Sequence, residues 1–285
     1  MLTLLACGSL FVLAAVNWAP PARATVWLVD LAIMTFAFVG LGMALLGMPL
    51  AALVDDNNTY SISRLQMAIL SILIVSAYLA ASMSNVLAAL KAPAGAGVRS
   101  ADPLLIEIPS SIWVLLGIHA TSWVGSPLIL STKKTQQADP VKASNVLNGL
   151  NSEVSPSPTA VAQFSKAAQR QSALASSRGE APPPPAEPVV FTNAGNVVTE
   201  THRNDASFAD LFRGEEIGNA QSLDLSKVQL FFFTLIVAVV YAFSLYASFQ
   251  AEGPIRKFPD LDSSIIALLG ISNAGYLANK VVPHS

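Results

Sequence analysis

Long apolar stretches alternate with polar ones along the chain, and the apolar stretches have the length of membrane spans. Five of them, each with about 20 residues or more, lie at 25–54, 65–88, 111–131, 228–249 and 263–282. A helix of about 20 apolar residues crosses a hydrocarbon core of about 30 Å. The pattern therefore predicts an all-α fold: a polytopic transmembrane helical bundle with about five to six spans.

The two ends of this pattern are less regular. Residues 1–18 form a shorter apolar run, followed by Ala22 and Ala24 in an A-x-A cleavage pattern, but no basic residue lies near Met1 as in an ordinary signal peptide. Residues 1–24 are therefore either a short first helix or a signal peptide. At the other end, polar residues interrupt 263–282, which has the weakest span pattern.

Two parts of the chain repeat one arrangement of polar and apolar positions. The polar residues that open each first helix coincide on alignment: Ser63, Arg64 and Gln66 in the first copy, and Ser226, Lys227 and Gln229 in the second. Further on, seven of seventeen positions are identical between 110–126 and 263–279. We infer a two-helix hairpin present twice, at 61–131 and 223–285. The copies are parallel because each contains an even number of spans.

The repeated residues have simple structural interpretations. Ser63 and, in the second copy, either Asp224 or Ser226 suit helix caps. Arg64 and Lys227 suit side chains that reach the headgroups, and the glutamines lie within the first turns, so all six repeated residues are expected at the membrane interface and the helix starts. Small residues allow close helix packing. The glycines expected to serve it are Gly40, Gly42 and Gly47, in the span region 25–60, with Gly117 and Gly270.

The S-[RK]-x-Q start, followed by L-L-G-I and an aromatic residue, resembles sequences of uncharacterised bacterial multi-pass membrane proteins. The resemblance covers 61–126 and 224–279 and implies a location without an activity. Arg64 and His119 depart from the Lys and Ser of the second copy, which puts a shared role for them in doubt.

Residues 132–222 are rich in Ser, Ala, Gln and Pro and have few large apolar residues. Such a composition does not offset the entropy of folding, so a disordered linker is expected, with a stiff proline run at 181–188 and a transient helix at 157–175. Segment 205–219 differs, because large apolar residues alternate there with acidic ones. These residues, which suit either partner docking or an interfacial helix, are Phe208, Leu211, Phe212 and Ile217.

Charge says little about orientation. Positive residues near the span ends are equal in number on the two sides of the membrane. Lys133 and Lys134 directly follow a span, with Lys142 close by, and they favour a cytoplasmic linker in a bacterial-type inner membrane. The net charge of −2, without a long run of one sign, gives no indication of nucleic-acid binding. Cys7, the only cysteine, excludes an internal disulfide.

Candidate chemistry is sparse. The histidines at 119, 202 and 284 are scattered, and we find no catalytic, metal or cofactor motif, so we expect a protein that is not an enzyme. Ionisable residues within spans deserve a functional hypothesis because burying them is costly. The candidates for an intramembrane polar site are Asp30, His119 and Asn273.

These features favour a non-enzymatic membrane anchor or assembly subunit that presents its linker to partner proteins. The alternative is a channel or small-solute transport subunit, in which a homo-oligomer surrounds Asp30, His119 or Asn273. An enzyme that acts on lipid is a distant third, because no polar group gathers at one interface.

Overall fold

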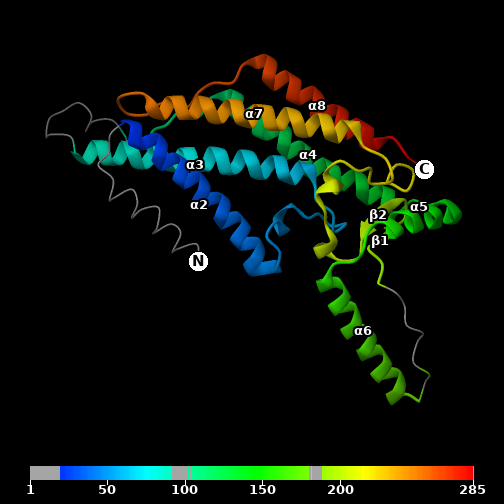
Figure 1. Cartoon of the computed structure of the whole chain (residues 1–285). Coiled ribbons are helices and arrows are strands. Elements are labelled where there is room, and N and C mark those ends of the chain that lie inside the picture. Colours follow the sequence, from blue (N-terminus) through cyan, green and yellow to red (C-terminus); the bar gives the residue numbers. More distant parts are fainter. Residues whose placement is uncertain (1–19, 92–101, 103, 180, 182–187, 285) are drawn as a thin grey trace. The chain divides into compact units, whose positions relative to one another are not determined.

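The structure is a computed structural model, which describes residues 20–91, 102, 104–179, 181 and 188–284. The expected first helix or signal peptide at 1–18 and most of the proline run at 181–188 lie outside the described residues. Figure 1 labels the helices and strands.

Seven α-helices, three short 3-10 helices and one β-hairpin make up the described part of the chain. The long helices are α2 (Pro20–Leu46), α3 (Ile62–Lys91), α4 (Ser110–Lys134), α7 (Leu225–Gln250) and α8 (Ser263–Val281). The shorter elements are η1 (Ala51–Leu53), α5 (Pro140–Glu153), α6 (Pro158–Ser177), β1 (Phe191–Ala194), β2 (Val197–Glu200), η3 (Arg203–Asp205) and η4 (Phe208–Leu211). The chain is thus mostly helical, as the apolar pattern predicts.

Four described helices, α2, α3, α4 and α7, are long and apolar enough to cross a membrane. Helix α8 has 19 residues but does not reach the same hydropathy. Its polar residues, including Asn273, Asn279 and Lys280, lower its hydropathy, so the expected span at 263–282 is a helix of weaker span character.

The chain divides into two compact units. Unit 1 comprises 1–52, 63–124 and 229–277, and unit 2 comprises 53–62, 125–228 and 278–285. The division falls within α4 and α8 and just after the start of α7, so unit 2 includes the last turns of α4 and α8 and the first turn of α7.

Unit 1 is a helical bundle with one apolar core. Trp27 of α2 stacks on Phe249 of α7, with 5.5 Å between the ring centroids. Polar bonds join its helices in pairs: Gln66 of α3 donates to Thr234 Oγ1 of α7 at 2.5 Å, and Ser122 of α4 donates to Asn273 Oδ1 of α8 at 2.6 Å. Helices α3 and α4 therefore contact α7 and α8, respectively, through buried hydrogen bonds.

The connection between α7 and α8 is fixed by polar side chains of unit 1. The Asn85 amide of α3 donates to the carbonyl of Ile255 at 2.8 Å and accepts from its N–H at 2.9 Å. Arg23 donates to the carbonyl of Gly253 at 2.6 Å. These bonds satisfy loop backbone groups that are costly to bury unpaired.

Unit 2 corrects the expectation of a disordered linker over 132–222. Helices α5 and α6, the hairpin β1–β2 and a separate apolar core occupy most of it, with Phe191, Val198, Leu150, Ile217 and Ala220 in that core. Few apolar residues suffice because polar side chains satisfy the backbone of neighbouring segments. The Asn151 side chain, for example, accepts from the N–H of Phe191 at 2.8 Å and donates to its carbonyl at 3.0 Å.

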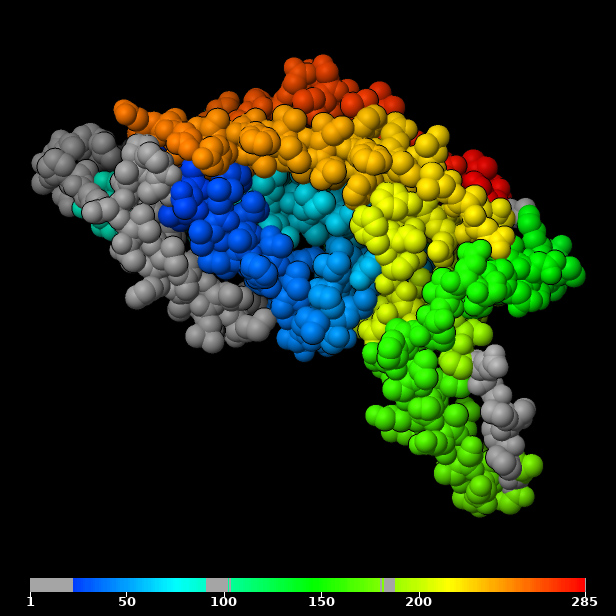
Figure 2. Space-filling model, in the orientation of Figure 1, coloured from blue at the N-terminus to red at the C-terminus, as the bar shows by residue number. Residues whose placement is uncertain are grey.

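Helix α6 covers what the sequence predicts as a transient helix at 157–175. Ser157 caps it, and Pro158 occupies its first turn, where a missing N–H costs nothing. Ala160 is its only buried residue, and Figure 2 shows much of its side facing the viewer uncovered. Its stability therefore depends little on packing within the described part of unit 2.

Gly42, in the last turns of α2, and Gly47, directly after this helix, lie where the chain turns at the helix end. A Cβ on Gly42 would lie 2.7 Å from the carbonyl oxygen of Met48 and 2.8 Å from that of Pro49, because the chain turns back over the helix end. Gly47, with φ +73°, occupies the left-handed position that commonly ends a helix. Among the described residues, an added Cβ on Gly117 would have no atom within 4 Å, and one on Gly270 would be in ordinary contact with Ile118 Cδ1 of α4 at 3.6 Å.

We therefore expect Gly42→Ala to destabilise unit 1, by about 1–3 kcal/mol, since the new methyl group overlaps backbone oxygen atoms. The matched control is Gly117→Ala, which should be neutral or stabilise by up to about 1 kcal/mol because alanine is the better helix former. Thermal unfolding of both variants in one detergent checks this. Equal melting temperatures would contradict the proposed role of Gly42.

Candidate functional site: a buried lysine–glutamate cluster

The acidic segment 213–219 is held in place by the β-hairpin of unit 2. The N–H of Val198 donates to the carbonyl of Glu215 at 2.9 Å, and the N–H of Ile217 donates to the carbonyl of Asn196 at 3.0 Å. Gly195 has φ +57°, as the tight hairpin turn requires. Glu215 and Glu216 consequently occupy fixed positions beside β2.

Three lysines from helix ends converge on these two glutamates. They come from the ends of three helices, which belong to unit 2: Lys133 from the last turn of α4, Lys227 from the first turn of α7 and Lys280 from the last turn of α8. Their exposed fractions are only 3%, 1% and 7%. We call these five residues the lysine–glutamate cluster.

Glu216 is paired with Lys133, whose Nζ lies 2.6 Å from Oε1. The same ammonium donates to the carbonyl of Val282 at 2.7 Å. Glu216 Oε2 accepts from Asn196 Nδ2 at 3.0 Å and from the backbone N–H of His284 at 3.1 Å. The pair therefore connects α4, the hairpin and the segment after α8.

Glu215 is shared by two lysines. Its Oε1 lies 2.7 Å from Lys227 Nζ and its Oε2 lies 2.6 Å from Lys280 Nζ. Lys227 also donates to the carbonyls of Asp210 at 3.1 Å and Arg213 at 2.7 Å, and Lys280 donates to Ser126 Oγ. Burial raises the pKa of Glu215, but the two lysines outweigh it and lower this pKa to about 2.

The chemistry of the cluster is structural. Buried charges are tolerated when they are paired and hydrogen-bonded, and each of the five side chains has a partner of opposite charge. The adjacent cavity, lined by Asp224, Asn279 and His284 among others, has about 10 Å³, room for one water molecule and not for a substrate. The described residues also contain no group of three metal ligands.

The interfacial roles expected for the repeated polar residues need correction. Lys227 does not reach the headgroups, because its ammonium is buried against Glu215. Gln66 is fully buried in the bond to Thr234, whereas Gln229 is exposed. Ser63 lies inside α3 without a hydrogen-bond partner in the described chain, so it is not a cap.

The cap of α7 is Asp224. Its carboxylate accepts from the N–H groups of Ser226 at 2.9 Å and Lys227 at 3.4 Å, and also from the Ser226 hydroxyl at 2.5 Å. Asn279 of α8 donates to both oxygens of the same carboxylate at 3.3 Å. Ser226 thus assists the cap, and Asp224 joins α7 to α8.

The four residues expected to dock a partner do not share one accessible face. Leu211 and Ile217 are each 2% exposed, and Ile217 belongs to the core of unit 2. Phe208 remains 62% exposed, and its ring meets the half-buried ring of Phe212 edge to face, with 5.3 Å between centroids. The docking hypothesis therefore fails for Leu211 and Ile217, because this chain itself covers them.

The proposed intramembrane polar residues are all buried within unit 1. His119 Nδ1 lies 2.7 Å from the carbonyl of Leu115, one turn earlier in α4, and Asn273 is bonded to Ser122 and to the carbonyl of Leu269. The Asp30 carboxylate has no hydrogen-bond partner in the described chain. Asn273 thus joins α8 to α4, whereas the Nδ1 hydrogen bond of His119 lies within α4.

A second buried acidic group lies around Glu200 at the end of β2. Burial, the largest cause, and the neighbouring carboxylates of Asp210 and Asp205 together raise its pKa to about 9, and Arg213 only partly opposes them. Asp210 accepts from the N–H of Ser207 at 2.7 Å and of Tyr60 at 3.3 Å. Glu200 therefore carries a proton at neutral pH.

The sequence contains signals for these features. Gly195 and Asn196, between two runs rich in β-branched residues, are a hairpin signal. Asp139-Pro140 and Ser157-Pro158 are start signals for α5 and α6. No protein-family model matches the chain, and no curated protein or solved structure matches it.

Proposed function

We propose that the chain is an integral-membrane anchor that holds a folded domain, unit 2, for a partner protein. The observation that carries this proposal is the lysine–glutamate cluster. It fastens segment 213–219 of unit 2 to the ends of α4, α7 and α8, of which α4 and α7 have the length and hydropathy of membrane spans. The cluster thus bonds the folded segment to the same three helices that continue into unit 1.

A cytoplasmic location for unit 2 in a bacterial-type inner membrane is part of the proposal. We rank the transport alternative second, since Asn273 is engaged by Ser122 of α4 and His119 Nδ1 by the carbonyl of Leu115 in its own helix. Homo-oligomerisation is compatible with the anchor but is not needed to complete the cluster.

Partner contact should occur at Phe208, whose ring is exposed. We expect a photo-reactive residue at 208 to cross-link in cells to one defined protein, whereas the same residue at the buried position 211 gives no such product. Mass identification of the product gives the partner. Phe208→Asp should abolish its co-purification, and Val141→Asp, at an exposed position on α5, should not. Retention of the partner by Phe208→Asp would contradict this part of the proposal.

A further inference from the structure

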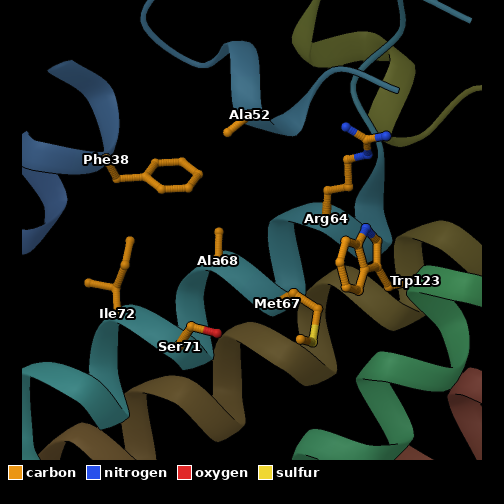
Figure 3. Close-up of a pocket in the computed structure, with 8 residues that line it drawn as sticks. All are labelled: Phe38, Ala52, Arg64, Met67, Ala68, Ser71, Ile72 and Trp123. Carbon is orange, nitrogen blue, oxygen red and sulfur yellow. The ribbon is translucent and has the colours of Figure 1, made fainter. Parts of the chain in front are cut away.

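Unit 1 has a groove that the anchor function does not use. It has a volume of about 240 Å³ and is lined by residues of α2, α3, α4 and the turn after α2: Phe38, Ala52, Arg64, Met67, Ala68, Ser71, Ile72 and Trp123. Figure 3 shows Phe38 and Trp123 on opposite sides, with Arg64 at one end of the row on α3 and Ile72 at the other.

The groove is long enough for most of an acyl chain in one leaflet. Its α3 residues reach from the third residue of the helix, Arg64, to the eleventh, Ile72. At 1.5 Å per residue, the stretch from Arg64 to Ile72 is about 12 Å long. This is most of the thickness of one leaflet, which is half of a hydrocarbon core of about 30 Å.

Its volume fits part of a chain better than a compact ligand. Pockets for drug-sized molecules usually begin at about 300 Å³. At about 30 Å³ per group of the size of a water molecule, the groove has room for about eight methylene-sized groups. Its walls are almost wholly apolar, except for Arg64 and Ser71.

The charge at its end distinguishes it from an ordinary apolar surface. In the second copy of the repeat the aligned base, Lys227, is buried against Glu215, whereas Arg64 is half-buried and borders the open groove. Arg64 already has an interaction within the chain. A guanidinium has five N–H donors, however, and its planar fork also suits a phosphate group. Trp123, 46% exposed, is a residue type common at membrane interfaces.

The geometry points to a binding site for an anionic phospholipid. One acyl chain lies in the groove between Phe38 and Trp123, and Arg64 holds the lipid phosphate. The inference rests on the membrane location in the proposed function but not on any partner protein, so it fails or succeeds independently of the cross-link at Phe208.

The test is native mass spectrometry of the purified full chain with added phosphatidylglycerol or phosphatidylcholine. The wild type should prefer phosphatidylglycerol. Arg64→Gln should reduce that preference about tenfold, the effect of losing one charged hydrogen-bonding group. Arg256→Gln, which removes an exposed arginine from the loop after α7, should leave it unchanged.

A second pair of variants tests the groove itself. Ala68→Phe fills it and should remove the tightly bound lipid, whereas Ala32→Phe, at an exposed position of α2, should retain it. Helical circular dichroism equal to that of the wild type shows that each variant is folded. A phosphatidylglycerol preference that survives Arg64→Gln would overturn the inference. It would also be overturned if Ala68→Phe converted a dimer into a monomer, since a second copy would then occupy the groove.

Discussion

Replacing Glu215 with glutamine should destabilise unit 2 by about 3–5 kcal/mol, the usual cost of removing one member of a buried ion pair. Lys227 and Lys280 would lose their shared carboxylate while remaining 1% and 7% exposed. A buried ammonium without a counter-charge keeps the cost of desolvation and loses the attraction that offsets it. The NH2 group of the glutamine would also face an ammonium group, and two hydrogen-bond donors cannot pair.

Limited proteolysis of unit 2 and thermal unfolding of the whole chain measure this effect. The matched control is Glu107→Gln, which removes a carboxylate 3.0 Å from Lys257 in a pair whose two side chains are both more than half exposed. Exposed pairs contribute little because water screens them. If Glu215→Gln unfolded at the same temperature as Glu107→Gln, the lysine–glutamate cluster would not be what holds segment 213–219.

The second large effect is a pH dependence that depends on Glu200. Its pKa is about 9 in the folded chain, against an ordinary value of 4.5. Between these values the folded state keeps a proton that the unfolded state releases. The free energy of unfolding therefore falls as pH rises from about 4.5 to 9, by about 1.4 kcal/mol per pH unit from this group.

Glu200→Gln should remove this slope, because glutamine is neutral at every pH and has nearly the same shape. The variant should resemble the wild type near pH 4.5 and become progressively more stable than it towards pH 9. Denaturant unfolding of unit 2 at several pH values checks this. A packing defect would shift stability equally at all pH values, so a difference independent of pH would contradict the role of Glu200.

The sequence predicts the helices of unit 1 well because hydropathy alone determines them. Apolar runs at 25–54, 65–88, 111–131 and 228–249 correspond to α2, α3, α4 and α7. It predicts side-chain roles less well. Gln66 and Gln229 have the same place in the repeat, yet one is buried in a bond to Thr234 and the other is exposed. That difference depends on contacts between helices, which a pattern along one helix does not contain.

The sequence predicts disorder for most of unit 2, whereas the structure shows a fold, and the reason lies in composition. Its composition has little apolar surface, which is the usual mark of disorder. Its order comes instead from polar pairs across long separations, such as Lys133 with Glu216 and Asn151 with Phe191. Composition does not report such pairs. The local signals are short: the hairpin signal at Gly195 and Asn196 and the helix starts at Asp139 and Ser157. Asn196 also donates to Glu216 directly.

Segment 132–222 contains a folded domain in which residues 213–219 are bonded to the ends of α4, α7 and α8. Amide hydrogen exchange of the full chain in lipid nanodiscs tests it most directly. The N–H groups of Val198, Ile217 and Ala220, which are hydrogen-bonded within unit 2, should be strongly protected, and Glu215→Gln should reduce that protection. Exchange at the rate of an unstructured chain throughout 190–222 would contradict the account.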